Sequence, residues 1–133
     1  MSFSHLTLPT RDVQATASFL EQTLGYTRDA APVNSPVETV WLNIRHGQQL
    51  HIVFVDGFSV SPFEGEFGRH VAVFHAVDRF PALRQQLRDL GAEVFDPERP
   101  SPFARFFFRE PVNGYVFEVI DSVRDGRPEG RDV

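Results

Sequence analysis

The sequence SHLTL at residues 4–8 is followed later in the chain by a similar stretch, RHVAV, at residues 69–73. Each stretch carries one histidine, His5 or His70, at the second position of a short apolar run. Each is followed by an aspartate, by apolar residues spaced as on one face of a helix, and by a glycine. Because the same order of signals occurs twice, the sequence predicts two copies of one structural unit.

The two expected helices share the same apolar spacing and the same end signals. Their apolar residues recur at steps of three and four, which is typical of one buried helix face. These residues are Val13, Ala17, Leu20 and Leu24 in the first helix, and Phe80, Leu83, Leu87 and Leu90 in the second. Asp12 and Asp78 are placed as the N-caps of the two helices. Gly25 and Gly91 are placed as the left-handed residues that follow the last turns.

Strand-like stretches follow each helix. In the first half, residues 38–45 (ETVWLNIR) and 48–55 (QQLHIVFV) flank a short turn. In the second half, residues 104–110 (ARFFFRE) and 115–121 (YVFEVID) flank an Asn-Gly turn, which is a strong hairpin signal. A middle strand is less clearly marked in both halves. Each half therefore reads as a strand, a helix and two or three further strands, and equivalent positions lie 65 to 67 residues apart.

This repeat predicts a single domain of the α+β class. We expect the domain to cover residues 1–121 and to contain two βαβββ modules, at residues 1–56 and 69–121, joined by a linker at 57–68. The segment 122–133 is polar and reads as a C-terminal tail. A chain of 133 residues is near the common size of one domain, which agrees with this organisation.

The composition excludes several classes of function. The chain has no cysteine, which excludes disulfides and thiolate metal ligands, and no lysine, which excludes a lysine nucleophile. A net charge of −5 argues against a nucleic-acid partner. The sequence has no run of about 20 apolar residues and no signal-peptide pattern, so we expect a soluble cytoplasmic protein without a membrane partner.

Four potential metal ligands occupy equivalent positions of the two halves. They are His5 and His70 in the first strands, and His51 and Glu118 in the middle of the last strands. A pseudo-twofold axis between the halves would bring all four together. Imidazole nitrogen and carboxylate oxygen suit Fe, Zn, Ni or Mn, and a buried carboxylate needs a cation or a hydrogen-bond partner. A hydrogen-bonded structural histidine is the ordinary alternative at any one position, but the coincidence of four positions favours a metal.

These residues resemble the vicinal oxygen chelate superfamily, which includes glyoxalase I, fosfomycin-resistance proteins, bleomycin-resistance proteins and extradiol dioxygenases. The matching stretches are HLTLPTRDVQATASFLEQTLGY, LHIVF, RHVAVFHAVD and NGYVFEVID, within residues 3–121. The resemblance implies two βαβββ modules that form a half-open mixed β-barrel around one divalent metal ion. It implies His5, His70 and Glu118 as ligands, with His51 at the position of a glutamate in glyoxalase I. It also implies a homodimer, with each metal site within one chain or shared between two.

The chemistry implied by the resemblance is Lewis-acid and template catalysis on a small substrate. Glyoxalase I uses a metal-bound glutamate as its base, so Glu118 and His51 are the candidate catalytic residues. Three imidazoles and one carboxylate around a divalent ion leave a net positive centre, which suits an anionic substrate. The positions that hold glutathione in glyoxalase I are Pro9 and Val55 here, which disfavours a glutathione-dependent reaction.

Candidate substrate-binding residues follow from strand parity, because residues two apart in a strand share one face. They are Thr7, Trp41, Asn43, Arg45, Phe74 and Arg105. If Trp41 and Asn43 face the metal, the pocket is aromatic with one polar anchor, and Arg45 or Arg105 could hold a carboxylate. The alternative for these residues is an ordinary place in the core or on the surface.

Two functions stay open at this point. One is a divalent-metal-dependent enzyme acting on a small oxygenated substrate, of the lyase or isomerase type or of the ring-cleaving dioxygenase type. The other is a bleomycin-resistance-type protein that binds a small molecule without metal or catalysis. The second gives no reason for the coincidence of His5, His51, His70 and Glu118, so the enzyme is favoured.

Overall fold

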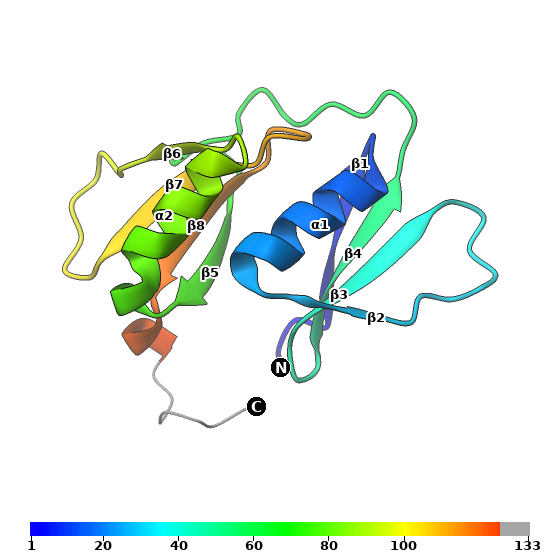
Figure 1. Ribbon diagram of the computed structural model, residues 1–133, viewed down its shortest axis with the longest axis horizontal. Coiled ribbons are helices and arrows are strands. Elements are labelled where there is room, and N and C mark those ends of the chain that lie inside the picture. The colour runs from blue at the N-terminus through cyan, green and yellow to red at the C-terminus, as the bar shows by residue number, and fades with distance from the viewer. Residues whose placement is uncertain (126–133) are drawn as a thin grey trace. The chain divides into compact units, whose positions relative to one another are not determined.

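Each half of the chain forms a four-stranded sheet with one α-helix on one face, in a computed structural model that describes residues 1–125 (Figure 1). The first compact unit comprises residues 1–59, and the second begins at Val60. Both units have the strand order that a βαβββ unit gives, with the first strand beside the last. The predicted α+β architecture of two βαβββ modules is therefore confirmed.

The first unit contains one helix and four strands. Its elements are β1 (His5–Thr10), α1 (Val13–Leu24), β2 (Thr27–Asp29), β3 (Thr39–Arg45) and β4 (Gln48–Phe54). The strand order is β1-β4-β3-β2. β1 runs parallel to β4, whereas β3 is antiparallel to both β4 and β2. The middle strand that the sequence marked only weakly is β2, three residues long and exposed.

The second unit repeats this plan. Its elements are β5 (Val71–His75), the 3-10 turn η1 (Val77–Arg79), α2 (Phe80–Asp89), β6 (Glu93–Phe95), β7 (Arg105–Arg109), β8 (Val116–Asp121) and the 3-10 turn η2 (Ser122–Asp125). The order is β5-β8-β7-β6, with β5 parallel to β8. Of the expected polar tail, residues 122–125 form η2, and residues 126–133 lie outside the described part of the chain.

One face of each sheet is covered by its helix. In the first unit, α1 packs on β3 and β4. The buried side chains of this core are Leu8, Val40, Leu42, Leu50 and Ile52 from the strands, and Val13, Ala17 and Leu20 from the helix. In the second unit, the Phe80 ring of α2 meets the Phe106 ring edge-on at 5.0 Å. Because strand side chains alternate, the opposite faces carry the other residues of each strand.

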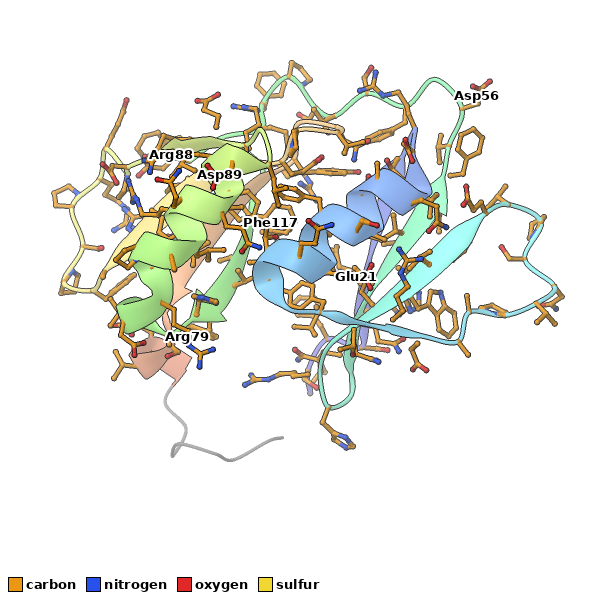
Figure 2. All side chains as sticks on the ribbon, in the orientation of Figure 1. Glu21, Asp56, Arg79, Arg88, Asp89 and Phe117 are labelled. Carbon is orange, nitrogen blue, oxygen red and sulfur yellow. The ribbon has the colours of Figure 1, made fainter. Side chains whose placement is uncertain are left out.

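The helix ends match the sequence pattern in the first unit but not in the second. Asp12 caps α1 by accepting a hydrogen bond from the N–H of Ala15, and Gly25 ends the helix at a φ of 75°. Asp78 does not cap α2, and this part of the prediction is wrong. Asp78 lies within η1, and the residue before α2 is Arg79, which makes no side-chain cap (Figure 2).

The reason for this difference is the 3-10 turn itself. η1 begins the helical path three residues before Phe80, so Asp78 is already inside a turn. A proline in the first turn of α2 then supplies a preset φ at a place where no N–H is needed. At the far end, Gly91 takes a φ of 93°, one residue beyond the Leu90 cap, and Leu90 itself stays 38 % exposed.

The two aspartates provide a matched test of helix capping. Asp12→Ala removes the acceptor for the Ala15 N–H and should lower the free energy of unfolding by about 1 kcal/mol. Asp78→Ala removes no capping bond and should cost markedly less. Chemical denaturation of the two variants beside the wild type measures both. Equal losses would contradict the assignment of the caps.

His75 makes stability depend on pH. Burial lowers the pKa of His75 below its ordinary value of 6.5, Arg79 lowers it further, and Asp78 opposes them. The unfolded chain therefore binds a proton at this site more readily than the folded chain. The stabilisation is present above the unfolded pKa and is lost as the pH falls through it toward the lower folded pKa.

We therefore expect His75→Gln to lose less stability than the wild type between about pH 7.5 and about pH 5. Urea unfolding at several pH values measures this slope. An identical slope in His75→Gln and in the wild type would show that protonation of His75 does not contribute.

Candidate functional site

His70 precedes β5 and has a defined tautomer. Its Nδ1 lies 3.0 Å from the backbone carbonyl oxygen of Gly65. A carbonyl oxygen only accepts hydrogen bonds, so Nδ1 must carry a proton. In the neutral imidazole, Nε2 then presents its lone pair. A backbone carbonyl on one ring nitrogen is the arrangement that fixes the other nitrogen for a metal.

Glu118 faces this lone pair from the middle of β8. Its Oε1 lies 3.3 Å from Nε2 of His70, and the residue is 7 % exposed. A nitrogen and a carboxylate oxygen that both lack hydrogen repel each other, so a proton or a cation must lie between them. Two ligands bound to one ion at about 2.0–2.2 Å are themselves about 3.0–3.4 Å apart. The spacing of His70 and Glu118 therefore fits two ligands of one metal ion.

The second oxygen of Glu118 is held by Arg105. Nη1 of Arg105, on β7, donates to Oε2 of Glu118 at 2.9 Å. The Arg105 side chain is only 3 % exposed, and its guanidinium lies 5.6 Å from the centre of the Phe107 ring. Such a charge-assisted bond in a buried place is strong and directional. Arg105 was predicted to bind a substrate carboxylate, whereas in the structure it is bonded to Glu118.

Glu66 holds the other side of Arg105. Its Oε2 lies 3.4 Å from Nη2 of Arg105, and its carboxylate accepts the N–H groups of Glu98 and Arg99 at 2.7 Å and 3.1 Å. Burial alone would raise the pKa of Glu66, but the two N–H donors and Arg105 outweigh it and hold that pKa below the usual value. The segment predicted only as a linker thus supplies a carboxylate to the ion-pair network.

In the first unit, three flat side chains stack on the sheet face away from α1. The ring of His51, on β4, lies between His5 of β1 and Trp41 of β3, with centroids 3.9 Å and 4.2 Å away. The two imidazole planes are only 14° apart. A metal ion lies in the plane of the imidazole that binds it, and planes this nearly parallel do not meet near the rings. As placed, the pair offers one ligand to an ion, not two.

A polar network decides which of the two imidazoles is free. The side-chain amide of Gln49 donates to Oδ2 of Asp29 and to Oδ1 of Asn43, so its oxygen faces Nε2 of His51 at 3.0 Å. That oxygen accepts, so Nε2 of His51 carries the proton and Nδ1 has the lone pair. Burial lowers the pKa of His51, and the charge on His5 lowers it further, which favours the neutral ring.

The remaining candidates lie on the same two faces. Thr7 pairs with His51 in the β1–β4 register, and Asn43 pairs with Gln49. Phe74, on β5, is 46 % exposed. Arg45 ends β3 beside an irregularity in the β3–β4 pairing, which separates it from the regular alternation of Trp41 and Asn43. Its role in anion binding stays a prediction.

The four predicted ligands lie as two pairs, one pair in each unit. His5 and His51 stack in the first unit, and His70 and Glu118 face each other in the second. Within residues 1–125, no three histidine, aspartate or glutamate side chains gather closely enough to hold a metal ion. The full ligand set is therefore a matter for proposal.

The strand orders found here, each with a ligand on the last strand and a histidine at or just before the first, define a glyoxalase-like class of fold. A sequence profile of the Glyoxalase/Bleomycin resistance protein/Dioxygenase superfamily matches residues 2–119. The chain belongs to this superfamily, as the resemblance predicted. No curated protein sequence matches the chain significantly.

Solved structures support the same fold. A possible glyoxalase from Bacillus cereus is 22% identical, with a TM-score of 0.68 over 90% of this chain and 98% of that chain. The genomically encoded fosfomycin resistance protein FosX from Listeria monocytogenes is 21% identical, with a TM-score of 0.72 over 90% and 89%. The oxidase ChaP-H2 is 22% identical, with a TM-score of 0.67 over 98% and 96%. Within residues 1–125, neither helix is long and apolar enough to span a membrane.

Two glycines in the 61–69 loop test how firmly it holds the second unit's site. A Cβ built on Gly68 would lie 1.7 Å from the carbonyl oxygen of Phe63, whereas one on Gly65 would meet nothing within 4 Å. Gly68→Ala should therefore cost about 1–3 kcal/mol of folding free energy. Gly65→Ala is the control and should cost far less. Thermal unfolding compares them, and equal melting temperatures would contradict the tight packing at Gly68.

Proposed function

We propose that the chain is an enzyme that binds one divalent metal ion through His5, His70 and Glu118 and acts on a small oxygenated substrate chelated to that ion. The observation that carries this proposal is the approach of His70 Nε2 to Glu118 Oε1, which needs a cation or a proton between them. His5 adds the third ligand, because its imidazole makes no hydrogen bond to the described residues. The three come from one chain or from two copies of it.

The donor set suits iron, zinc, nickel or manganese. When bound, the ion supplies Lewis-acid chemistry by stabilising negative charge on substrate oxygens. Two neutral imidazoles and one carboxylate leave positions open for such oxygens and leave a net positive centre. A structure of FosX from Listeria monocytogenes contains Mn(II) and 1S,2S-dihydroxypropylphosphonic acid, which is consistent with this class of ligand.

We assign His51 the role of proton acceptor. Nε2 of His51 is committed to Gln49, so Nδ1 is the nitrogen that can take a proton from a substrate. Glu118 is the less suitable base, because Arg105 holds one oxygen and the other faces His70. Its proposed role is that of a ligand. Stacking on Trp41 and His5 keeps the His51 ring in one orientation.

The substrate would lie on the side-chain face shared by Thr7, Trp41 and Asn43. Trp41 offers a flat apolar surface, and Thr7 offers a hydroxyl. Oδ1 of Asn43 is occupied by Gln49, which leaves its amide hydrogens to donate to a substrate oxygen. Phe74 would contribute an apolar contact from the second unit. Together these residues suit a small molecule with one apolar part and several oxygens.

The reaction type depends on the metal. Zinc, nickel or manganese would fit lyase or isomerase chemistry, in which a proton moves next to a charge-stabilised oxygen. Iron would fit oxygen-dependent ring cleavage. A second candidate function is binding of a planar small molecule without metal, of the bleomycin-resistance type, which the Trp41–His51–His5 stack favours.

Metal content separates these functions. Protein without a His-tag, offered Mn, Fe, Ni and Zn and then desalted, should hold close to one ion per chain. His70→Ala and Glu118→Ala should lose most of it, because each removes one of the two facing donors. His51→Ala should keep its metal, since the proposed role of His51 is proton transfer. His46→Ala, in the β3–β4 turn, is the histidine control.

The outcomes are distinct. A wild type without metal sinks the proposed enzyme and favours the planar-ligand protein. Loss of metal in His51→Ala as large as in His70→Ala would restore His51 as a ligand. Retention of metal in both His70→Ala and Glu118→Ala would place any metal site elsewhere.

A further inference from the structure

We propose that Arg105 is a positioning residue that fixes Glu118 as a one-oxygen metal ligand. The proposal rests on the metal-binding role of Glu118 given above. It concerns how the carboxylate is presented, which the family of the chain does not determine. Its basis is the pattern of bonds around the guanidinium.

Arg105 has a partner on every guanidinium nitrogen. Nε donates to Oγ of Ser101 at 3.1 Å, and Nη1 donates to Oε2 of Glu118 at 2.9 Å. Nη2 donates to the carbonyl oxygen of Arg99 and approaches Oε2 of Glu66 at 3.4 Å. Four of the five N–H donors of an arginine are thereby directed at the protein. A guanidinium tied at each nitrogen is not a free anchor for a substrate anion.

The partners of Arg105 are themselves fixed. Glu66 accepts two backbone N–H groups, from Glu98 and Arg99, so its carboxylate cannot turn without breaking them. The Arg99 carbonyl belongs to the same short segment. Arg105 therefore sits in a rigid cradle made by the 61–69 loop and by the segment before β7. Loss of either side would free the guanidinium to move.

The consequence falls on the two oxygens of Glu118. Oε2 is held by Arg105 and cannot reach an ion on the His70 side, whereas Oε1 faces Nε2 of His70. A carboxylate held in this way binds an ion through one oxygen rather than two. Single-oxygen binding leaves one more position on the ion for substrate. The guanidinium also shares the negative charge of the carboxylate, which makes the bound ion a stronger Lewis acid.

Manganese titration of the purified protein tests the proposal without an activity assay. Arg105→Gln should weaken Mn(II) binding by about tenfold to a hundredfold, as losses of outer partners of metal ligands do. Arg105→Lys keeps the charge but not the fork of donors, so it should recover only part of the affinity. Glu66→Gln should show a smaller loss. Arg109→Gln is the matched control, since Arg109 is on the same strand and contacts Glu93 and Gly114 instead.

Cobalt absorption reports the coordination directly. Co(II) bound to Arg105→Gln should have a weaker visible band than Co(II) bound to the wild type, because a freed carboxylate binds through both oxygens and raises the coordination number. Arg109→Gln should give the wild-type spectrum. A merely structural role for Arg105 would lower the melting temperature of the metal-free protein and leave both the spectrum and the affinity unchanged.

Each outcome decides a separate question. If the wild type binds no Mn(II), the proposed function fails first. If the wild type binds and Arg105→Gln matches it in affinity and spectrum, the positioning role is overturned. Should Arg105→Gln not fold, Arg105→Lys and Glu66→Gln decide. Wild-type affinity in both would overturn the proposal, and graded losses in both would support it.

Discussion

The charge of Glu118 lies within a sheet built of phenylalanine, and the second unit is arranged around it. A carboxylate in such a place costs several kcal/mol unless a cation and hydrogen bonds compensate it. Arg105 is that cation, but it is buried as well and brings one more positive charge than Glu118 can share with a metal. Glu66 supplies the balancing carboxylate and is in turn held by two backbone N–H groups. One buried charge thus explains why the 61–69 loop is ordered against the segment before β7.

The fold was largely predictable because it rests on local, periodic signals. The apolar faces of α1 and α2, the Asp12 cap and the Gly25 end each depend on residues within a few positions of one another. Asp78 failed as a cap because a 3-10 turn occupies the position before α2, and no local pattern announced that turn. The short strands β2 and β6 were poorly marked because they have three residues each and little buried surface.

The candidate site was predictable only in part. Strand parity correctly placed His51 with Trp41 on one face and His75 on the other side from His70, since alternation is a property of the strand itself. Gln49 and Glu66 were missed. Gln49 acts across three strands, and Glu66 meets Arg105 from 39 residues away, through a loop that carries no periodic pattern. Such contacts depend on register and loop path, and a spacing rule does not contain them.

The stack on the first sheet has a practical side. Trp41 is the single tryptophan of the chain, and its ring lies 4.2 Å from His51 with the two planes 7° apart. Indole emission is quenched by a protonated imidazole in contact with it and by a paramagnetic ion nearby. The intrinsic fluorescence of the protein therefore comes from one place, beside the histidine of greatest interest. The molecule carries its own optical reporter there, with no label to attach and no second indole to obscure the signal.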